Sequence, residues 1–477
     1  MVRIALRTIG ILLVLAVAAI GAYAIYMDIP GQARAFTTMT AKLMCSGVFV
    51  AGRDEKDVWQ QDFVRLSPQG KYMELATLKV DHAEKSVTSS GLGGLVSGKA
   101  IYRKGVGCTA LVGKTEAEVR AQGEGVETTL SPPDPALPWP EGDATIESQL
   151  PPNVDAALLT AALDKAFSEP DPAKPRKSRE VVVIYQGRII AERYAPGFTK
   201  DTALISQSMA KSILSAVVGI QIGEGKLKLD EPAPVREWAD PKDPRHAITL
   251  NNLLRMDSGL KFDERYDTPY SDTNRQYTTG DFASYTAALP LEAPPGTKFN
   301  YSTGTSNILG RIAREAAGTN MSDGFAAPRR LLFEPLGARS MTMEVDAAGS
   351  LQGGSFVYAT ARDYARFGLL YMRDGMWNGV RVLPEGWVKY TLTPTPTASP
   401  KKPYGAQFWL NTGNDTTQHR WPNVPADAFI LSGFQGQNVI GIPSRDVVVV
   451  RLGLTEFDNW DVSILVEDVL KAIGPNS

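Results

Sequence analysis

The chain has 477 residues, which predicts two or three domains at about 100–200 residues each. Its 50 Lys and Arg nearly balance 52 Asp and Glu, and the formal charge of -2 argues against a nucleic-acid-binding protein. Two cysteines and three histidines exclude a four-thiolate zinc site and leave little material for histidine-rich metal centres.

The first predicted element is an apolar helix. Arg3 and Arg7 precede an uncharged run from Thr8 to Met27, which at about 1.5 Å per residue just spans a bilayer core of about 30 Å. Because the run exceeds the usual core of a signal peptide, residues 1–27 are predicted to form an uncleaved membrane anchor. A small-x-small pattern at 22–24 keeps a cleaved signal peptide open as the alternative. A buried helix of a soluble protein is disfavoured, since the run is apolar all round.

Basic residues before the run favour a cytoplasmic N-terminus and an exported body. The rest of the chain is then expected at the inner membrane with its bulk in the periplasm or outside the cell, or secreted to the periplasm if the signal is cleaved. Cys45 and Cys108 would lie in an oxidising compartment and are predicted to form a disulfide, with two buried free thiols as the alternative. In the chain-entropy model, closing a loop of about 60 residues stabilises the fold by about 4 kcal/mol.

Residues 28–130 are predicted to form a small separate unit of mixed pattern, without a catalytic motif, and nothing in them indicates their task. Residues 131–153 are rich in proline and are predicted to form a stiff, extended linker. We expect this linker to lay the small unit against the main domain.

Residues 154–477 have the pattern of an α/β domain. Residues 180–192 predict two strands joined at Gln186-Gly187, and Ser208 to Ile222 predicts a long buried helix. Residues 446–453 predict a buried strand, and 460–473 a final amphipathic helix. Strands at both ends with helices between them favour one antiparallel sheet covered by helices.

The helix that begins near Ser208 carries a candidate nucleophile and base. Ser208 and Lys211 are three residues apart, which puts hydroxyl and amine on one helix face. A serine hydroxyl needs a neighbouring group to take its proton, and Lys211 can do so if burial lowers its pKa. The alternative is an N-cap serine with a surface lysine, because Ser-x-x-Lys also occurs by chance and recurs at 399–402.

Two later segments extend this candidate site. Tyr301 precedes another predicted helix, and an adjacent ammonium group would favour its phenolate, so that it could serve as base or acid. The glycine-rich stretch 432–437 predicts a strand edge whose backbone N–H near Phe434, opposite that of Ser208, would complete an oxyanion hole. A packed core tyrosine and an ordinary glycine-rich hairpin are the alternatives.

In order and approximate spacing, Ser208-x-x-Lys211, Tyr301-Ser302-Thr303 and the stretch 432–437 resemble the serine β-lactamase-related superfamily. The likeness is to its class C β-lactamase and esterase branch, and most of all to 6-aminohexanoate-dimer hydrolases. It covers about residues 175–470, and the intervening stretches 253–260, 353–368 and 375–379 agree with it.

The resemblance implies a β-lactamase/transpeptidase-like α/β domain with an all-helical subdomain and a cleft between them. It implies Ser208 as acylated nucleophile, Lys211 as its proton partner, Tyr301 as general acid and base, and the N–H groups of Ser208 and Phe434 as oxyanion donors. It requires no metal or cofactor. Residues expected to line the cleft are Thr303, Gly433, Gln435 and Gly436. Gln435 and Gln437 could contact substrate, but the preferred interpretation is that both glutamines face solvent.

Two departures bear on the substrate. Thr303 stands where many relatives have asparagine, and Ser432-Gly433-Phe434 stands where class C enzymes have Lys-Thr-Gly. The missing cation disfavours substrates whose carboxylate is held there, which are penicillins and D-alanyl peptides. We therefore expect a serine hydrolase for a small-molecule amide or ester, with a penicillin-binding carboxypeptidase or β-lactamase as the alternative. An inactive envelope-binding protein is the third hypothesis, and the sequence assigns no oligomeric state.

Overall fold

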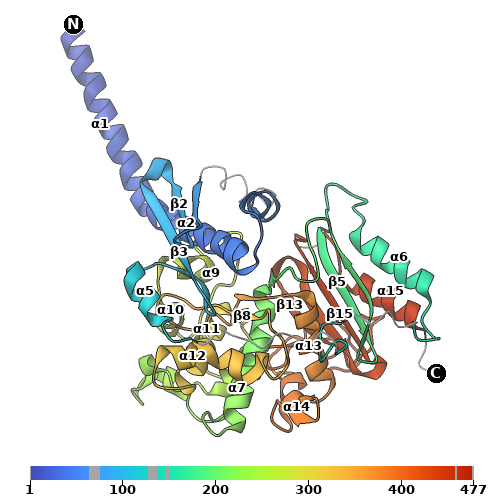
Figure 1. Ribbon diagram of the computed structural model, residues 1–477. Coiled ribbons are helices and arrows are strands. Elements are labelled where there is room, and N and C mark those ends of the chain that lie inside the picture. The colour runs from blue at the N-terminus through green and yellow to red at the C-terminus, as the bar shows by residue number, and fades with distance from the viewer. Residues whose placement is uncertain (1, 64–75, 127–136, 145–149, 457–458, 475–477) are drawn as a thin grey trace.

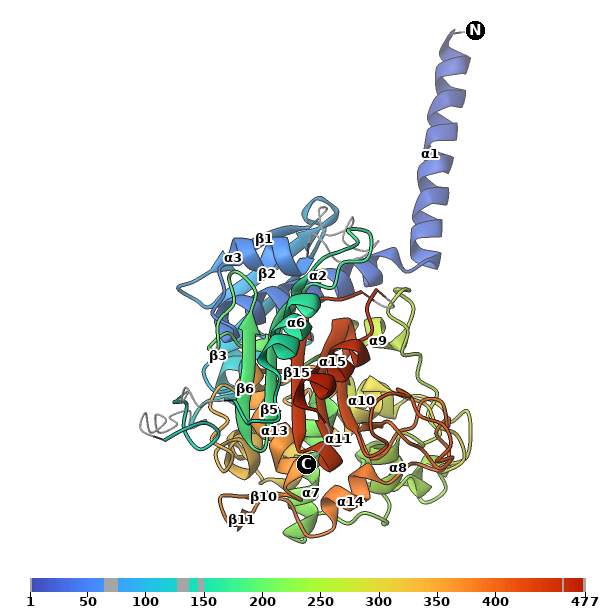
Figure 2. The same cartoon turned by 90° about the vertical axis from the view of Figure 1, so that its right-hand side faces the viewer.

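Three parts follow one another along the chain in the computed structural model, which describes residues 2–63, 76–126, 137–144, 150–456 and 459–474 (Figure 1). They are a projecting N-terminal helix, a small N-terminal unit, and a larger body that carries the central sheet. In the body, helix α6 precedes the hairpin of β5 and β6, and the last helix, α15, returns to pack on the same sheet beside α6 (Figure 2).

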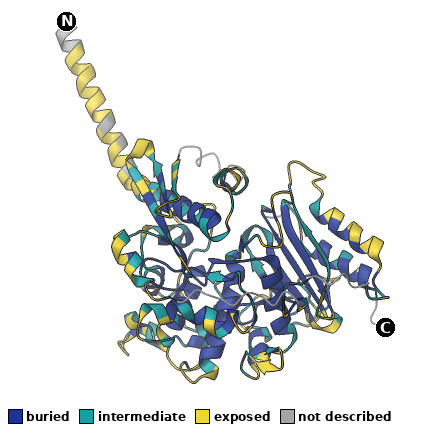
Figure 3. Ribbon diagram, viewed as in Figure 1, coloured by how far each residue is buried: buried dark blue, intermediate teal, exposed yellow. Residues whose placement is uncertain are grey.

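Helix α1 (Val2–Tyr26) stands away from the rest of the molecule, and its described side chains are exposed (Figure 3). Its segment Leu6–Tyr23 is long and apolar enough to cross a membrane, and none of that segment is buried. A buried helix of a soluble protein therefore does not fit, whereas an anchor and a signal sequence both do. The helix ends at Tyr26, and Asp28, with a positive φ of 49°, turns the chain into α2 (Ile29–Cys45).

The N-terminal unit packs α2 across a four-stranded antiparallel sheet in the order β1-β2-β3-β4. Helix and sheet approach closely at Gly98, where a Cβ atom would lie 2.5 Å from the backbone nitrogen of Thr38. The predicted disulfide between Cys45 and Cys108 is confirmed, and it ties α2 to β4 inside a small core. The elements of the unit are α3 (Glu55–Val58), β1 (Thr77–Asp81), β2 (Ser86–Gly91), β3 (Val96–Arg103), β4 (Gly107–Ala110) and α5 (Glu116–Gln122).

A buried ion pair joins the unit to the body. Lys42 of α2 donates to Glu344, and both side chains are almost fully buried. The same carboxylate accepts hydrogen bonds from the Ser46 hydroxyl at 2.9 Å and the Cys108 backbone N–H at 2.6 Å. Because Lys42 and Cys108 lie 302 and 236 residues from Glu344 in the chain, these bonds fix the N-terminal unit against the body.

Part of the proline-rich linker is also held on the body. Arg366 donates to the carbonyl oxygens of Pro140 at 2.9 Å and Gly142 at 2.7 Å, and Trp139 enters the main core. These contacts hold residues 139–142 of the linker on the body. Its segments 131–136 and 145–149 are outside the described residues.

The body is built on a six-stranded antiparallel sheet in the order β12-β13-β14-β15-β5-β6, which confirms the predicted sheet. Helices α6 and α15 cover one face, and α7 and α13 cover the other. A Cβ at Gly368 of α13 would lie 2.8 Å from the Val448 side chain, so glycine permits the helix to pack closely on the sheet. The strands are β5 (Ser178–Tyr185), β6 (Arg188–Tyr194), β12 (Trp409–Leu410), β13 (Phe429–Gly433), β14 (Gln437–Ile442) and β15 (Val447–Gly453), and the helices are α6 (Ala156–Phe167), α7 (Ala210–Gly223), α13 (Ala361–Met372) and α15 (Ser463–Ile473).

A mainly helical region packs beside α7 and completes the expected architecture. Helix α11, which begins at Thr303, contacts α7, α8, α10 and α12, and so links this region to the sheet side of the body. The remaining elements are α8 (Leu250–Arg255), α9 (Asp272–Arg275), α10 (Phe282–Ala287), α11 (Thr303–Ala316), α12 (Met321–Pro328), α14 (Trp387–Leu392), β7 (Leu204–Ile205), β8 (Thr342–Met343), β9 (Val357–Ala359), β10 (Met376–Trp377) and β11 (Val380–Arg381).

Candidate active site

Ser208 lies in a single 3-10 turn, Gln207–Met209, that leads directly into α7. The residue before it, Gln207, has a φ of 47°, a left-handed conformation that side-chain-bearing residues rarely adopt. The backbone N–H of Ser206 donates to Val357 at 2.7 Å and anchors the turn on β9. The hydroxyl of Ser208 is thus held at the N-terminal end of a buried helix, where the helix dipole favours developing negative charge.

Lys211 lies one helical turn later and is 1% exposed. Its Nζ is 3.1 Å from Ser208 Oγ, 2.9 Å from Thr303 Oγ1 and 2.7 Å from the carbonyl oxygen of Gly354. The carbonyl can come this close because Gly354 has no side chain: a Cβ there would lie 2.8 Å from Thr303. Among the described residues, no carboxylate forms an ion pair with this amine.

Burial lowers the pKa of Lys211 to about 8, and the negative charge of Glu264 opposes that shift. A pKa near neutrality gives a substantial fraction of free amine under physiological conditions, as a general base requires. The N-cap serine with a surface lysine, which was the alternative for this motif, is wrong.

Tyr301 brings a third polar group to Ser208, with which its hydroxyl shares a hydrogen bond. Its ring centroid is 5.0 Å from Lys211 Nζ, and the ring stacks on Trp409 at 5.3 Å. The expectation that the lysine would favour the phenolate is wrong. Burial, followed by the charge of Glu264, raises the pKa of Tyr301 well above its ordinary value. The phenol therefore stays protonated, which favours a proton-donating role.

Glu264 is a member of the site that the sequence did not indicate. It accepts a hydrogen bond from the Thr303 backbone N–H at 2.7 Å and another from the Thr303 hydroxyl. The Tyr266 hydroxyl donates to the same carboxylate at 2.7 Å. Because Thr303 in turn contacts Lys211, Glu264 acts on the amine through one hydroxyl and through its charge. No local motif marks this residue, which is brought to α11 only by the fold.

The end of strand β13 lies against the turn that precedes Ser208. A Cβ at Gly433 would be 2.3 Å from the carbonyl oxygen of Ser206, so only glycine lets the two segments approach this closely. The next residue, Phe434, stacks on Tyr266 with ring centroids 4.9 Å apart. The structure therefore places Gly433 against the turn that contains Ser208, and Phe434 against Tyr266. The role of the Phe434 N–H as an oxyanion donor stays a prediction.

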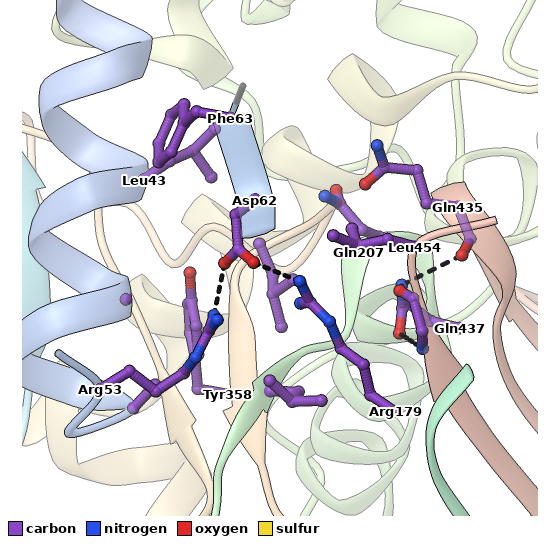
Figure 4. A pocket seen from close by; sticks show the side chains of 15 residues that line it. Leu43, Arg53, Asp62, Phe63, Arg179, Gln207, Tyr358, Gln435, Gln437 and Leu454 are labelled. Atoms are coloured by element: carbon purple, nitrogen blue, oxygen red, sulfur yellow. Dashed lines mark hydrogen bonds and ion pairs between the residues drawn. The ribbon is translucent and has the colours of Figure 1, made fainter. Parts of the chain in front are cut away.

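The two residues after Phe434 have other surroundings. Gln435 has a φ of 62° and lines a pocket between the body and the N-terminal unit, together with Gln207 (Figure 4). On the far side of this pocket, Asp62 pairs with both Arg53 and Arg179 (Figure 4). The carbonyl of Gly436 accepts a hydrogen bond from Arg451 at 2.8 Å, which is a structural contact.

Gln437, expected among the solvent-facing glutamines, is instead 2% exposed and donates to the Gly453 carbonyl. That expectation is wrong because the side chain bridges two neighbouring strands. Both Gln435 and Gln437 line the pocket shown in Figure 4.

A cation lies near the site in spite of the missing Lys-Thr-Gly lysine. The guanidinium of Arg420 lies over the ring of Trp409, with its Cζ 5.0 Å from the ring centroid, and also contacts Trp421 at 5.4 Å. Its Nη1 is buried and has no hydrogen-bond partner among the described residues. Trp409 thus has Tyr301 and Arg420 as ring neighbours. The neighbouring His419 contacts the Thr412 hydroxyl at 2.8 Å.

The sequence of this chain is similar to those of known proteins. A family model described as "Beta-lactamase" matches residues 164–464, well over half of the chain. The 6-aminohexanoate-dimer hydrolase of Paenarthrobacter ureafaciens is 28% identical over 294 residues, which cover 57% of this chain and 71% of that protein.

Solved structures show the same fold at lower identity. A protein of Bacillus anthracis provisionally named a 6-aminohexanoate-dimer hydrolase superposes with a TM-score of 0.50 at 22% identity, covering 65% of this chain and 80% of its own. A penicillin-binding protein homologue of Caulobacter crescentus superposes with a TM-score of 0.52 at 16% identity, covering 68% of this chain and 99% of its own.

Proposed function

The chain belongs to the beta-lactamase family, and on this premise we propose that it is a serine hydrolase that cleaves an amide or ester through an acyl-enzyme on Ser208. The observation that carries the proposal is the 3.1 Å contact between Ser208 Oγ and the buried amine of Lys211. A hydroxyl next to an amine whose pKa is about 8 has a base at hand near neutral pH.

In the acylation step, Ser208 Oγ attacks the substrate carbonyl carbon while its proton passes to the free amine of Lys211. The resulting oxyanion accepts hydrogen bonds from the backbone N–H groups of Ser208 and Phe434. When the bond to the leaving amine or alcohol breaks, the protonated Tyr301 donates a proton to it, and the ammonium group of Lys211, which holds the proton taken from Ser208, returns a proton to the phenolate. Water then attacks the acyl carbon and gives up a proton to the free amine of Lys211. The bond to Ser208 Oγ breaks, Ser208 regains its proton from Lys211, and the acid is released.

For the substrate, we propose a small linear amide or ester. Support comes from the 6-aminohexanoate-dimer hydrolase relative, whose name denotes a short linear amide. The serine at position 432 agrees, because it cannot supply the cation that a class C enzyme offers to a substrate carboxylate at that strand. We further propose that α1 anchors an exported enzyme, which is supported by its exposed apolar segment and by the Cys45–Cys108 disulfide.

One observation favours the alternative of a penicillin-binding carboxypeptidase or β-lactamase. Arg420 presents a buried, unpartnered Nη1 beyond Trp409, next to the ring of Tyr301. A guanidinium is well suited to bind a carboxylate. A substrate carboxylate bound by Arg420 would not need a lysine on the strand.

The proposal is tested on the full-length protein in detergent with a fluorophosphonate probe. We expect the wild type to be labelled and Ser208→Ala to lose labelling completely. Ser212→Ala is the matched control, because Ser212 lies on the same helix, is buried, and donates to the Gln407 carbonyl instead. Ser212→Ala should label normally. Absence of Ser208-dependent labelling would overturn the proposal and leave the inactive binding protein.

A substrate panel separates the two enzyme hypotheses. Short esters, linear amides and a labelled penicillin are given to the wild type, Ser208→Ala and Arg420→Gln. We expect turnover of amides or esters that depends on Ser208. Stable penicillin labelling that disappears in both variants would favour the penicillin-binding alternative.

A further inference from the structure

We propose that the loop between β2 and β3, residues 91–96, is a second membrane contact, inserted by its leucines into the bilayer that α1 is proposed to cross. We call it the membrane loop. The inference rests on the anchoring part of the proposed function and is independent of the catalytic part.

The membrane loop exposes large apolar side chains. Leu95 is 87% exposed and Leu92 is 50% exposed, and the value for Leu95 exceeds that of every other large apolar side chain described, including Tyr26 at the end of α1 with 82%. Isolated exposed leucines are common on soluble proteins. Two at the tip of one hairpin form an apolar surface that water solvates poorly.

The backbone of the loop holds these side chains outward at a conformational cost. Leu92 has a φ of 52°, a left-handed conformation that is unusual for a bulky residue. Gly93 and Gly94 continue it with φ values of 66° and 94°. A Cβ at either glycine would meet no atom within 4 Å, so packing does not dictate the shape of this loop. A half-exposed leucine kept in such a conformation indicates a role for its side chain.

The two ends of the same strands differ sharply in charge. Residues 86–98, which include the membrane loop, contain no charged side chain. At the opposite end, the turn between β1 and β2 carries Asp81, Glu84 and Lys85. A hairpin exposed only to water would have no reason to be charged at one end and apolar at the other. One end in lipid and the other in water accounts for the difference.

The membrane loop lies at the end of the N-terminal unit from which α1 projects. A Cβ at Gly91 would be 3.3 Å from the Thr37 side chain of α2, the helix that directly continues α1. Figure 1 shows the β2–β3 hairpin reaching up to the level of the lower end of α1, and Figure 2 shows the two separated horizontally. The membrane loop and the last turns of α1 therefore lie at the same level along the axis of α1, which is the proposed direction across the membrane.

Aromatic residues at this level fit a membrane–water interface. Tyr23 and Tyr26 are exposed on the last turns of α1. Tyr270, from the body, is 43% exposed and its hydroxyl donates to the Met27 carbonyl at 3.0 Å. Tyrosines concentrate where the apolar core of a bilayer meets water. With the membrane loop as a second contact, the body cannot rotate freely about α1, and the active site keeps a constant orientation to the membrane.

The test places an environment-sensitive NBD fluorophore on single engineered cysteines of the full-length protein in phosphatidylcholine vesicles. Labelling is selective because Cys45 and Cys108 are joined in a disulfide. Leu95→Cys reports on the membrane loop, and Leu13→Cys on the proposed span. Glu84→Cys is the matched control at the opposite, charged end of the hairpin.

We expect the fluorophore at position 95 to shift to the blue and to be quenched at least about two-fold by doxyl-labelled lipid, as expected for insertion at the acyl boundary. Position 13 should be quenched and position 84 should not. If position 95 behaves like position 84, the inference is overturned.

Two further outcomes would also overturn it. A blue shift at position 95 without quenching by doxyl lipid would mean that protein, for example a second copy of this chain, covers the loop. Absence of quenching at position 13 would remove the anchor as well. Neither result affects the Ser208 labelling, so failure of the inference and failure of the proposed catalysis are distinguishable.

Discussion

Two buried lysines, each hydrogen-bonded to a serine on its own helix, show how surroundings decide the chemistry of one side chain. At the junction of the N-terminal unit and the body, Lys42 contacts Ser46 and forms an ion pair with Glu344. In the candidate active site, Lys211 contacts Ser208, a threonine hydroxyl and a carbonyl oxygen. Burial lowers the pKa of both amines, but only Lys42 has a direct carboxylate partner that opposes the shift.

The comparison separates a structural lysine from a reactive one. A buried charge next to an opposite charge is stable only while both remain, so such a pair holds two parts of a protein together. A buried amine surrounded by neutral oxygens loses its proton readily and serves as a base. The same substitution should therefore have opposite consequences at the two positions.

Lys211→Met removes the proposed base and should have the largest effect. We expect the rate of ester or amide hydrolysis to fall at least about 100-fold, as for loss of a general base. The free energy of unfolding should be unchanged or higher, because a poorly solvated amine is replaced by an apolar side chain. Turnover of a p-nitrophenyl ester and a denaturant titration measure the two quantities. A near-normal rate would contradict the role given to Lys211.

Lys42→Met should give the reverse pattern. It leaves the carboxylate of Glu344 buried without its cation, so we expect the free energy of unfolding to fall by about 3–5 kcal/mol. Activity per folded molecule, counted by fluorophosphonate labelling, should stay within about two-fold, since the hydrogen bonds of Lys42 within the described part of the chain go to Ser46 and Glu344 and not to the candidate active site. The double variant Lys42→Met/Glu344→Met serves as control and should recover part of the stability. Loss of activity in fully folded Lys42→Met would contradict the assignment of Lys42 as a purely structural lysine.

Glu264→Gln should have the smallest effect and sharpen the comparison. Since the charge of Glu264 raises the pKa of Lys211, its removal lowers that pKa below about 8. The base is active when deprotonated, so the rising limb of the rate with pH should move to lower pH. We expect a several-fold loss of rate as well, because the hydrogen bonds to Thr303 weaken. A pH–rate profile measures both effects, with Glu84→Gln as the remote control; a limb that moves to higher pH would refute this role of Glu264.

Features that depend on neighbours in the chain could be predicted from the sequence. The i, i+3 spacing of Ser208 and Lys211, the hairpin at Gln186-Gly187 and the apolar run of α1 follow from local periodicity. The antiparallel sheet followed from strands at both ends of the domain, and the disulfide from the inferred compartment. These features could be predicted because residue type and spacing along the chain are enough to specify them.

Contacts between distant segments could be settled only by the tertiary structure. Glu264 and Thr303 are hydrogen-bonded although they lie 39 residues apart in the chain, and Glu344 and Lys42 although they lie 302 residues apart. No local sequence pattern predicts either contact. The direction of the Tyr301 pKa was also decided there. Its residue type allows either sign, and desolvation together with the charge of Glu264 raises that pKa. Sequence determines which groups are present and how they repeat along a helix or strand, whereas burial and long-range charge exist only once the chain has closed around them.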